Sequence, residues 1–74
     1  MVSENKKALL AFGQHVRELR KRRGLSQEDL ALESGLDRTF VSHVERGARN
    51  ASILSVLKLG KALRVKPSRL LDCF

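Results

Sequence analysis

A chain of 74 residues is long enough for one small domain, whose thin core leaves no room for a deep catalytic cleft. Fifteen lysines and arginines against eight acidic residues give a formal charge of +7. This charge suggests an anionic partner, nucleic acid before a membrane surface, and is equally compatible with a role in solubility alone. Three phenylalanines are the only aromatic residues, so aliphatic helix packing must supply most of the stability.

Cysteine content and hydropathy indicate the compartment. The single cysteine, Cys73, cannot form an internal disulfide, which is typical of a protein in a reducing compartment. No apolar run approaches the roughly 20 residues that span a bilayer. The N-terminal apolar stretch ALLAF is too short for a secretory signal. We therefore expect a cytoplasmic protein with one domain over residues 1–74.

The first predicted helix runs from about Glu4 to Arg23, with Ser3 as its N-cap. Gly24 then allows the left-handed conformation that ends a helix. Apolar residues recur at helical spacing and define the buried stripe: Leu9, Phe12, Val16 and Leu19.

The second predicted helix follows Ser26, where the letters SQED approximate a capping box. We expect Leu30 and Ala31 to face inward, with Leu32 beside them, and Gly35 to turn the chain. The third predicted helix spans residues 38–46, between the N-cap Asp37 and Gly47. Its inward-facing residues are Val41 and Val44.

Two more helices complete the prediction. The fourth runs from Ile53 to about Arg64 after Ser52, and the fifth is short, with Pro67 in its first turn. No segment alternates polar and apolar residues with the period of two that a strand requires. The sequence therefore predicts an all-α domain of five helices.

The second and third helices and the turn between them have the spacing of a helix-turn-helix, over residues 26–47. In that motif the second helix lies in the major groove of DNA and its N-terminal residues reach base edges. Polar residues gather on the outward face of the third helix: Arg38, Thr39, Ser42, His43 and Arg46.

Residues 26–47 also resemble the Cro/phage-repressor, or Xre-type, family of DNA-binding domains. The resemblance rests on Ser26-Gln27, Leu30-Ala31, Gly35, Val41-Ser42 and Glu45-Arg46-Gly47, and it extends over nearly the whole chain. The family usually has Ala where this chain has Gly60, so either the fourth helix is weakened or a neighbour approaches closely there. The segment LDRTFVSHVERGARN is similar to the recognition segment of restriction–modification controller proteins, and also to that of other Xre-type regulators.

Two residues begin the third helix with side chains suited to base contacts. An arginine at position 38 suits guanine O6 and N7, and Thr39 suits a base hydrogen bond or a thymine methyl group. The resemblance implies base or phosphate contacts at Ser42 and His43, although His43 is equally compatible with an inert surface position. Phe40 lies between the two faces, so it either packs against the second helix or makes apolar contact at the groove.

The resemblance further implies that Gln27 bridges a phosphate and the third helix. We expect phosphate contacts from Arg46, Arg49 and Asn50, with Arg49 also a candidate base reader. These residues complete the predicted DNA-binding set.

A buried ion pair is implied by the resemblance at Arg20 and Glu45, and we interpret it as structural. Arg20 falls on the inward side of the first helix, four residues after Val16, and Glu45 falls beside the inward-facing Val44. Catalysis finds no support, because His15 and His43 lie on separate helices without a partner at metal-ligand spacing. We expect no catalytic residue, metal, cofactor or small-molecule ligand.

Residues 53–74 are more apolar than a protomer needs, which predicts a homodimer. The fourth helix forms one apolar face with Ile53, Val56, Gly60 and Leu63. Apolar residues at the edge of that face and at the C-terminus form the expected interface: Leu54, Leu57, Leu70, Leu71 and Phe74. The alternative is that Leu70 and Phe74 close the core of their own protomer.

The function that the sequence favours is a sequence-specific transcriptional regulator that binds double-stranded DNA as a homodimer. The main alternative is the antitoxin of a toxin–antitoxin pair that also binds its own promoter. A membrane-surface protein would concentrate its cations on one long helix with aromatic residues opposite. A nuclease would need an acidic cluster that this chain lacks.

Overall fold

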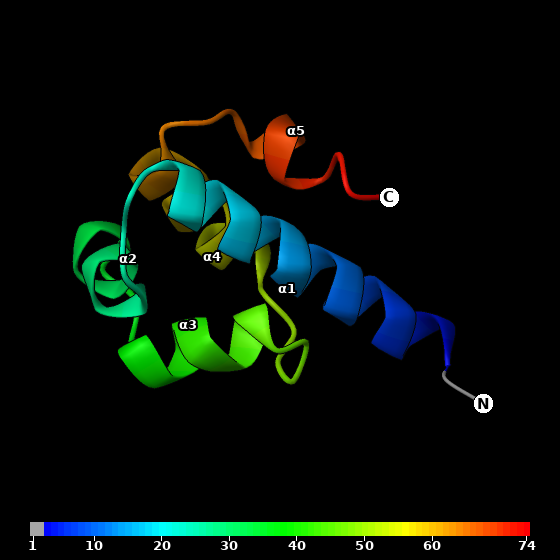
Figure 1. The fold of residues 1–74 in the computed structure, drawn as a ribbon. Helices are drawn as coiled ribbons and strands as arrows, with labels where there is room; N and C mark the ends of the chain where they lie inside the picture. The colour runs from blue at the N-terminus through cyan, green and yellow to red at the C-terminus, as the bar shows by residue number, and fades with distance from the viewer. Residues whose placement is uncertain (1–2) are drawn as a thin grey trace.

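The computed structural model describes residues 3–74, which fold into helices joined by short loops, with no strand among them (Figure 1). The helices are α1 (Glu4–Arg22), α2 (Gln27–Ser34), α3 (Arg38–Glu45), α4 (Ile53–Leu63) and α5 (Pro67–Leu70). The all-α prediction and the five predicted helices are confirmed for this part of the chain.

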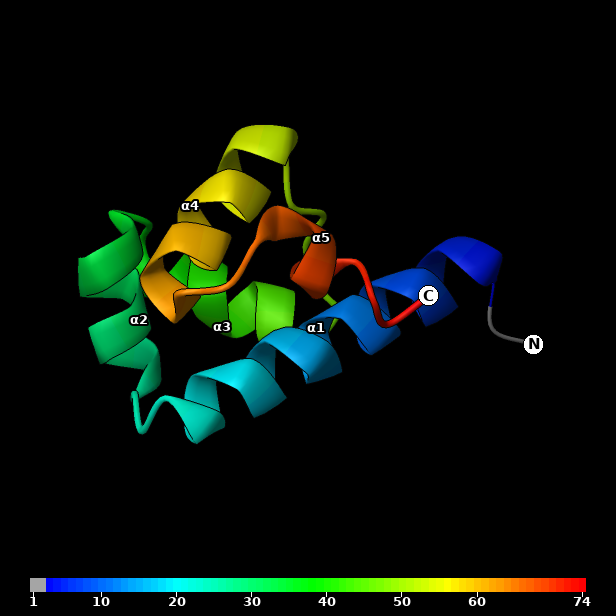
Figure 2. The same ribbon diagram turned by 90° about the horizontal axis from the view of Figure 1, so that it is seen from above.

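The longest helix, α1, lies along one side of the domain and contacts α3 and α5. In Figure 1, α3 lies along the lower edge of the molecule and α5 lies above α1. The view from above shows α4 across the domain from α1, where it contacts α2 and α5 (Figure 2). The helix-turn-helix pair α2 and α3 therefore lies at one end of the domain, with one side of α3 facing outward.

The core is mainly aliphatic and receives side chains from all five helices. Burying one such side chain contributes about 1.5–3 kcal/mol relative to leaving it exposed, so a small set of residues fixes the packing. The largest fully buried side chains are Val16, Leu30, Val41, Val44, Leu59, Leu63 and Leu70.

Side-chain caps define where four of the helices begin. The hydroxyl groups of Ser3, Ser26 and Ser52 each accept a hydrogen bond from a backbone N–H in the following turn. The Asp37 carboxylate accepts one from the Thr39 N–H at 2.8 Å. Such caps satisfy backbone donors that have no partner within the helix.

The structure corrects several details of the sequence prediction. Leu32 is 77% exposed, because the short helix α2 contacts only α3 and α4 closely and buries Leu30 and Ala31 against them. On the predicted apolar face of α4, Gly60 and Leu63 are buried in the protomer core, and only Ile53 at the start of the helix is largely exposed, at 80%. The first, third and fourth helices each end one residue earlier than predicted, since Arg23, Arg46 and Arg64 are their C-caps.

One member of the predicted dimer interface is also placed elsewhere. Leu70 is completely buried in the core of its own protomer, so it offers no surface to a partner. Phe74, by contrast, is 70% exposed and does not close that core. Among residues 3–74, no helix has both the length and the apolar character that crossing a bilayer requires.

Candidate nucleic-acid interface

A tight turn sets the angle between α2 and α3. Gly35 ends α2 with a φ of 74°, in the left-handed region where a residue with a Cβ is strained. The chain then turns, and Asp37 caps the start of α3. The two helices pack against each other, which leaves α3 at the edge of the domain (Figure 1).

The two faces of α3 differ sharply in burial. Val41, Val44 and Glu45 are buried against the rest of the domain. On the opposite face, Arg38 and Thr39 are exposed, and Ser42 is half-buried. The exposed face therefore begins at the N-terminal turn of α3.

The first of two hollows on this surface, the Gln27 hollow, is lined by Gln27, Arg38, Thr39 and Ser42. Its lining comes from the first turn of α2 and the first two turns of α3. All four side chains carry hydrogen-bonding groups, and one carries a full positive charge. This hollow is therefore suited to hydrogen-bond acceptors such as phosphate oxygens or base edges.

The second hollow, the Phe40 hollow, lies on the other side of α3 and reaches α4. Phe40 is half-buried and packs against the core, and the Arg49 guanidinium lies 5.5 Å from the centre of its ring. Ser55 of α4 also lines this hollow, although no pattern in the sequence linked α4 to the interface. The complete lining is Leu36, Asp37, Thr39, Phe40, His43, Arg49 and Ser55.

Two of the expected DNA-binding residues lie outside both hollows. Arg46 is exposed at the C-terminal end of α3. Asn50 lines a separate apolar groove, together with Leu71 and Phe74 near the C-terminus. The structure thus brings seven of the nine predicted residues around two hollows that share Thr39.

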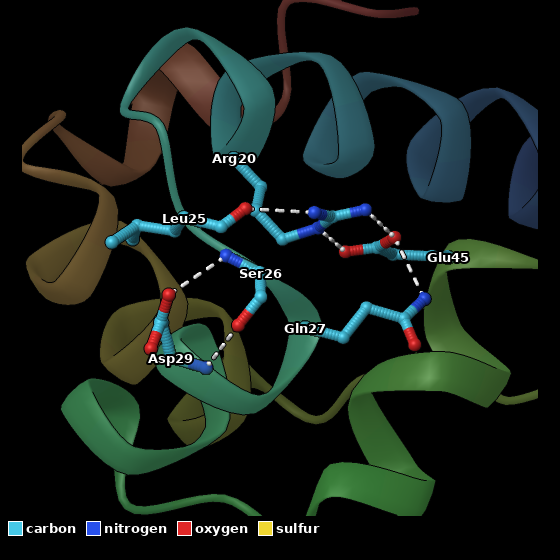
Figure 3. Close-up of polar contacts among 6 residues, drawn as sticks. All are labelled: Arg20, Leu25, Ser26, Gln27, Asp29 and Glu45. Atoms are coloured by element: carbon cyan, nitrogen blue, oxygen red, sulfur yellow. Dashed lines mark hydrogen bonds and ion pairs between the residues drawn. The ribbon is translucent and has the colours of Figure 1, made fainter.

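The expected ion pair between Arg20 and Glu45 is present and buried (Figure 3). Arg20 Nε donates to Glu45 Oε2 at 2.7 Å, and Nη2 donates to Oε1 at 3.0 Å. Arg20 Nη1 donates to the Leu25 carbonyl at 2.8 Å. This bidentate geometry joins α1 to α3 and to the segment that leads into α2.

Gln27 extends the same network to the interface. Its Nε2 donates to Glu45 Oε1 at 3.1 Å, which orients the amide beside the first turn of α2 (Figure 3). One N–H of the amide is used in this bond, and the second N–H is available to a ligand in the Gln27 hollow. The buried ion pair therefore also positions a residue of the candidate interface.

Other polar contacts stabilise the scaffold behind the interface. Arg23 Nη2 donates to Glu33 Oε1 at 3.0 Å and to the Ala62 carbonyl at 3.3 Å, which ties the end of α1 to α2 and α4. His15 Nε2 lies 2.7 Å from the Arg69 carbonyl oxygen and joins α1 to α5. Sequence spacing gave no sign of these contacts, because each links residues on different helices.

Among residues 3–74, two ionisable groups have shifted pKa values, and both lie outside the two hollows. The backbone N–H and the side chain of Ser26 lower the pKa of the Asp29 carboxyl by hydrogen bonding to it. Burial raises the pKa of the Cys73 thiol, which keeps it protonated and weakly nucleophilic. Within residues 3–74, no three His, Cys, Asp or Glu side chains converge as a metal site would require.

Comparison with known proteins places the sequence in a family. A family model described as helix-turn-helix matches residues 16–70, which include α2, α3 and α4. The chain belongs to the helix-turn-helix family. The match starts in the middle of α1 and ends at the last residue of α5.

Relatives of this helix-turn-helix protein include restriction–modification controllers. Control protein C.BamHI of Bacillus amyloliquefaciens is 50% identical over 64 residues, which cover 85% of this chain and 79% of that protein. The crystal structure of controller protein C.AhdI from Aeromonas hydrophila superposes with a TM-score of 0.83 at 56% identity, over 84% of this chain and 94% of that chain. Controller protein C.Esp1396I, solved as a tetramer with its natural 35 base-pair operator, has a TM-score of 0.80 at 35% identity, over 88% and 86%.

Proposed function

We propose that this protein is a sequence-specific transcriptional regulator of the controller type, which binds operator DNA as a homodimer and reads the major groove with α3. The observation that carries the proposal is the exposed face of α3. Its first turn presents Arg38 and Thr39 outward, while Val41 and Val44 hold the opposite face against the core. An outward-facing second helix of this kind fits the major groove.

Each residue of the Gln27 hollow has a role in this proposal. Arg38 makes the bidentate contact to a guanine, and Thr39 contacts the neighbouring base. Ser42, one turn further along α3, donates a hydrogen bond from its hydroxyl group to a base or a phosphate. Gln27 donates its second amide N–H to a phosphate, in an orientation that Glu45 fixes. Phosphate contacts of this kind set the register of the protein on the duplex.

The remaining cations strengthen binding without reading sequence. Arg46 is exposed where α3 ends, and Arg49 is exposed in the loop that follows. In this proposal both contact phosphates that flank the groove, and Arg49 is also a candidate base reader. The net charge of +7 adds a general attraction to DNA that weakens as salt concentration rises.

Dimerisation is proposed through exposed apolar side chains of α4 and the C-terminus. Four large apolar side chains in this region are exposed: Leu54, Leu57, Leu71 and Phe74. Exposed apolar surface of this kind is typical of a protein–protein interface. A two-fold axis would separate two copies of α3 by about 34 Å, one turn of DNA. Two half-sites also give the discrimination that one small module lacks.

The relatives support this function and its biological context. C.BamHI is named a control protein, and C.Esp1396I is a restriction–modification controller solved on its natural operator. By similarity to them, we propose that this chain regulates the genes of a restriction–modification system in the cytoplasm. That role requires DNA and a second protomer, and it uses no catalytic residue or cofactor.

A gel-shift assay with genomic fragments and excess competitor DNA tests this proposal. The protein should shift only a small subset of fragments. Nuclease footprinting on each shifted fragment should protect two related half-sites. Uniform affinity for all fragments would show that the positive charge binds DNA without reading its sequence, and the proposal would then be wrong.

A further inference from the structure

Arg49 differs from the other arginines of the interface because a loop carries it. Arg49 lies between the end of α3 at Glu45 and the start of α4 at Ile53, and it is exposed to solvent. The ion pairs found among residues 3–74 use Arg20, Arg23 and Arg69. A long side chain on an exposed loop samples many rotamers, so it loses much freedom when it binds a ligand.

One contact counteracts this freedom. The Arg49 guanidinium carbon lies 5.5 Å from the centre of the Phe40 ring, within the range over which an aromatic face attracts a cation. Phe40 is itself anchored, because it is half-buried on α3 and packs against the core. The ring is therefore a fixed platform, and the loop arginine is the group that it orders.

We propose that Phe40 is a positioning residue that acts on DNA through Arg49. A guanidinium held over a ring still has its N–H groups at the edge of its plane, where a phosphate or a guanine accepts two hydrogen bonds. The platform holds this edge beside α3 before DNA arrives, so less freedom is lost on binding. The inference rests on the proposed function, because it assigns a role within the same interface.

A double-mutant cycle on operator affinity tests the coupling. The variants are Phe40→Leu, Arg49→Ala and the combination of both, measured by fluorescence anisotropy on a duplex that the wild type selects. Phe40→Leu should weaken binding roughly two- to thirtyfold, the range that a cation–π contact supports. The double variant should bind no more weakly than Arg49→Ala alone, and Phe40→Tyr should restore the affinity that Phe40→Leu loses.

Additive losses in the cycle would overturn the inference, because they would mean that Phe40 acts independently of Arg49. Circular dichroism melts identify a variant that unfolds at the assay temperature, in which case Phe40→Met replaces Phe40→Leu in the same cycle. A wild type that binds selectively while the losses are additive refutes only the positioning role. A wild type without any sequence preference refutes the proposed function as well.

A second readout needs no DNA. Protons over an aromatic face resonate upfield, so the Arg49 Hδ signals in the free protein report the contact directly. They should lie upfield in the wild type and in Phe40→Tyr, and should return to ordinary values in Phe40→Leu. Ordinary values in the wild type would overturn the inference whatever the DNA affinities are.

Discussion

The Arg20 guanidinium lies within a run of basic residues, yet its contacts are with the protein. Lys21 and Arg22 beside it are exposed, whereas Arg20 is buried against Glu45 and the Leu25 carbonyl. Helical geometry explains the difference, because position 20 follows Val16 by four residues and therefore lies on the same buried face. A basic run on one helix thus serves both the fold and the surface.

Arg20→Ala should lower the free energy of unfolding by about 3–5 kcal/mol, because it strands the buried Glu45 carboxylate. Arg22→Ala is the matched control, since it removes an exposed charge and should change stability by no more than about 0.5 kcal/mol. Urea unfolding of both variants measures the difference. Equal midpoints would contradict a structural role for the pair.

Helical spacing predicts whether a side chain faces the core or the solvent. It does not predict the path of a loop or the contacts between residues of different helices. The inward position of Arg20 follows from its spacing, and so does the outward position of Arg38. The approach of Arg49 to Phe40 depends on the path of a loop, and no periodicity describes that path. Ser55 joins the same hollow from α4, which only the tertiary structure reveals.

At the scale of elements, two helical glycines mark close approaches of different severity. A Cβ at Gly13 would overlap the Val44 and Glu45 carbonyl oxygens, where α1 crosses α3. A Cβ at Gly60 would lie 3.2 Å from the Val65 carbonyl oxygen, a tight but nearly tolerable contact. The sequence left two readings open for Gly60, and the structure shows the close neighbour.

Gly13→Ala should therefore destabilise the fold by about 1–3 kcal/mol, although alanine is the better helix former. At Gly60 the gain in helix propensity and the tight contact oppose each other, so Gly60→Ala should stay within about 1 kcal/mol of the wild type. Thermal melts of both variants rank the two sites. A larger loss for Gly60→Ala would mean that the α1–α3 crossing is looser than described.

The capping box of α2 makes the stability of that helix depend on pH. Hydrogen bonds from Ser26 hold the pKa of the Asp29 carboxyl below its ordinary value of 3.8. A lowered pKa means that the stabilisation is complete above the unfolded-state value and is lost as pH falls through the folded-state value.

Replacing Asp29 by alanine should consequently cost stability at neutral pH, and the cost should shrink as the pH falls below about 4. Glu28→Ala is the control, because Glu28 lies in the same turn but is not the capping-box partner of Ser26. Urea midpoints of the two variants over this pH range provide the measurement. A pH-independent cost for Asp29→Ala would rule out the charge as its source.

The number and order of helices were predictable because each helix carries its own caps and apolar spacing. Ser3, Ser26 and Asp37 all cap the helices that they were expected to cap. Leu32 was misplaced because α2 has only eight residues, too few for apolar spacing to fix which side is buried. Short elements take their orientation from their neighbours.

At the scale of the whole molecule, the C-terminal apolar residues divide between two tasks. Leu70 fills the protomer core, whereas Leu71 and Phe74 remain exposed a few residues later. Composition alone does not separate these tasks, since α5 has only four residues and takes its position from packing against α4 and α1. The exposed residues, Leu71 and Phe74, belong to the surface that we propose for the dimer interface.

Leu57→Glu should convert the protein from a dimer to a monomer, because it places a charge in the proposed interface. Leu32→Glu adds the same charge to a more exposed leucine on α2, outside that interface, and should leave the dimer intact. Sedimentation velocity distinguishes the two masses. A monomeric wild type, or a Leu57→Glu variant that stays dimeric, would place the interface elsewhere.

The central claim is that α3 reads DNA sequence through its first turn, and selection from a random duplex library tests it most directly. The wild type should enrich two related half-sites whose centres lie about one helical turn apart. Arg38→Ala should bind about 1–3 kcal/mol more weakly and lose its preference at one base pair of each half-site, with no change in its unfolding midpoint. An Arg38→Ala variant that enriches the same motif as the wild type, or a wild type that enriches none, would contradict the claim.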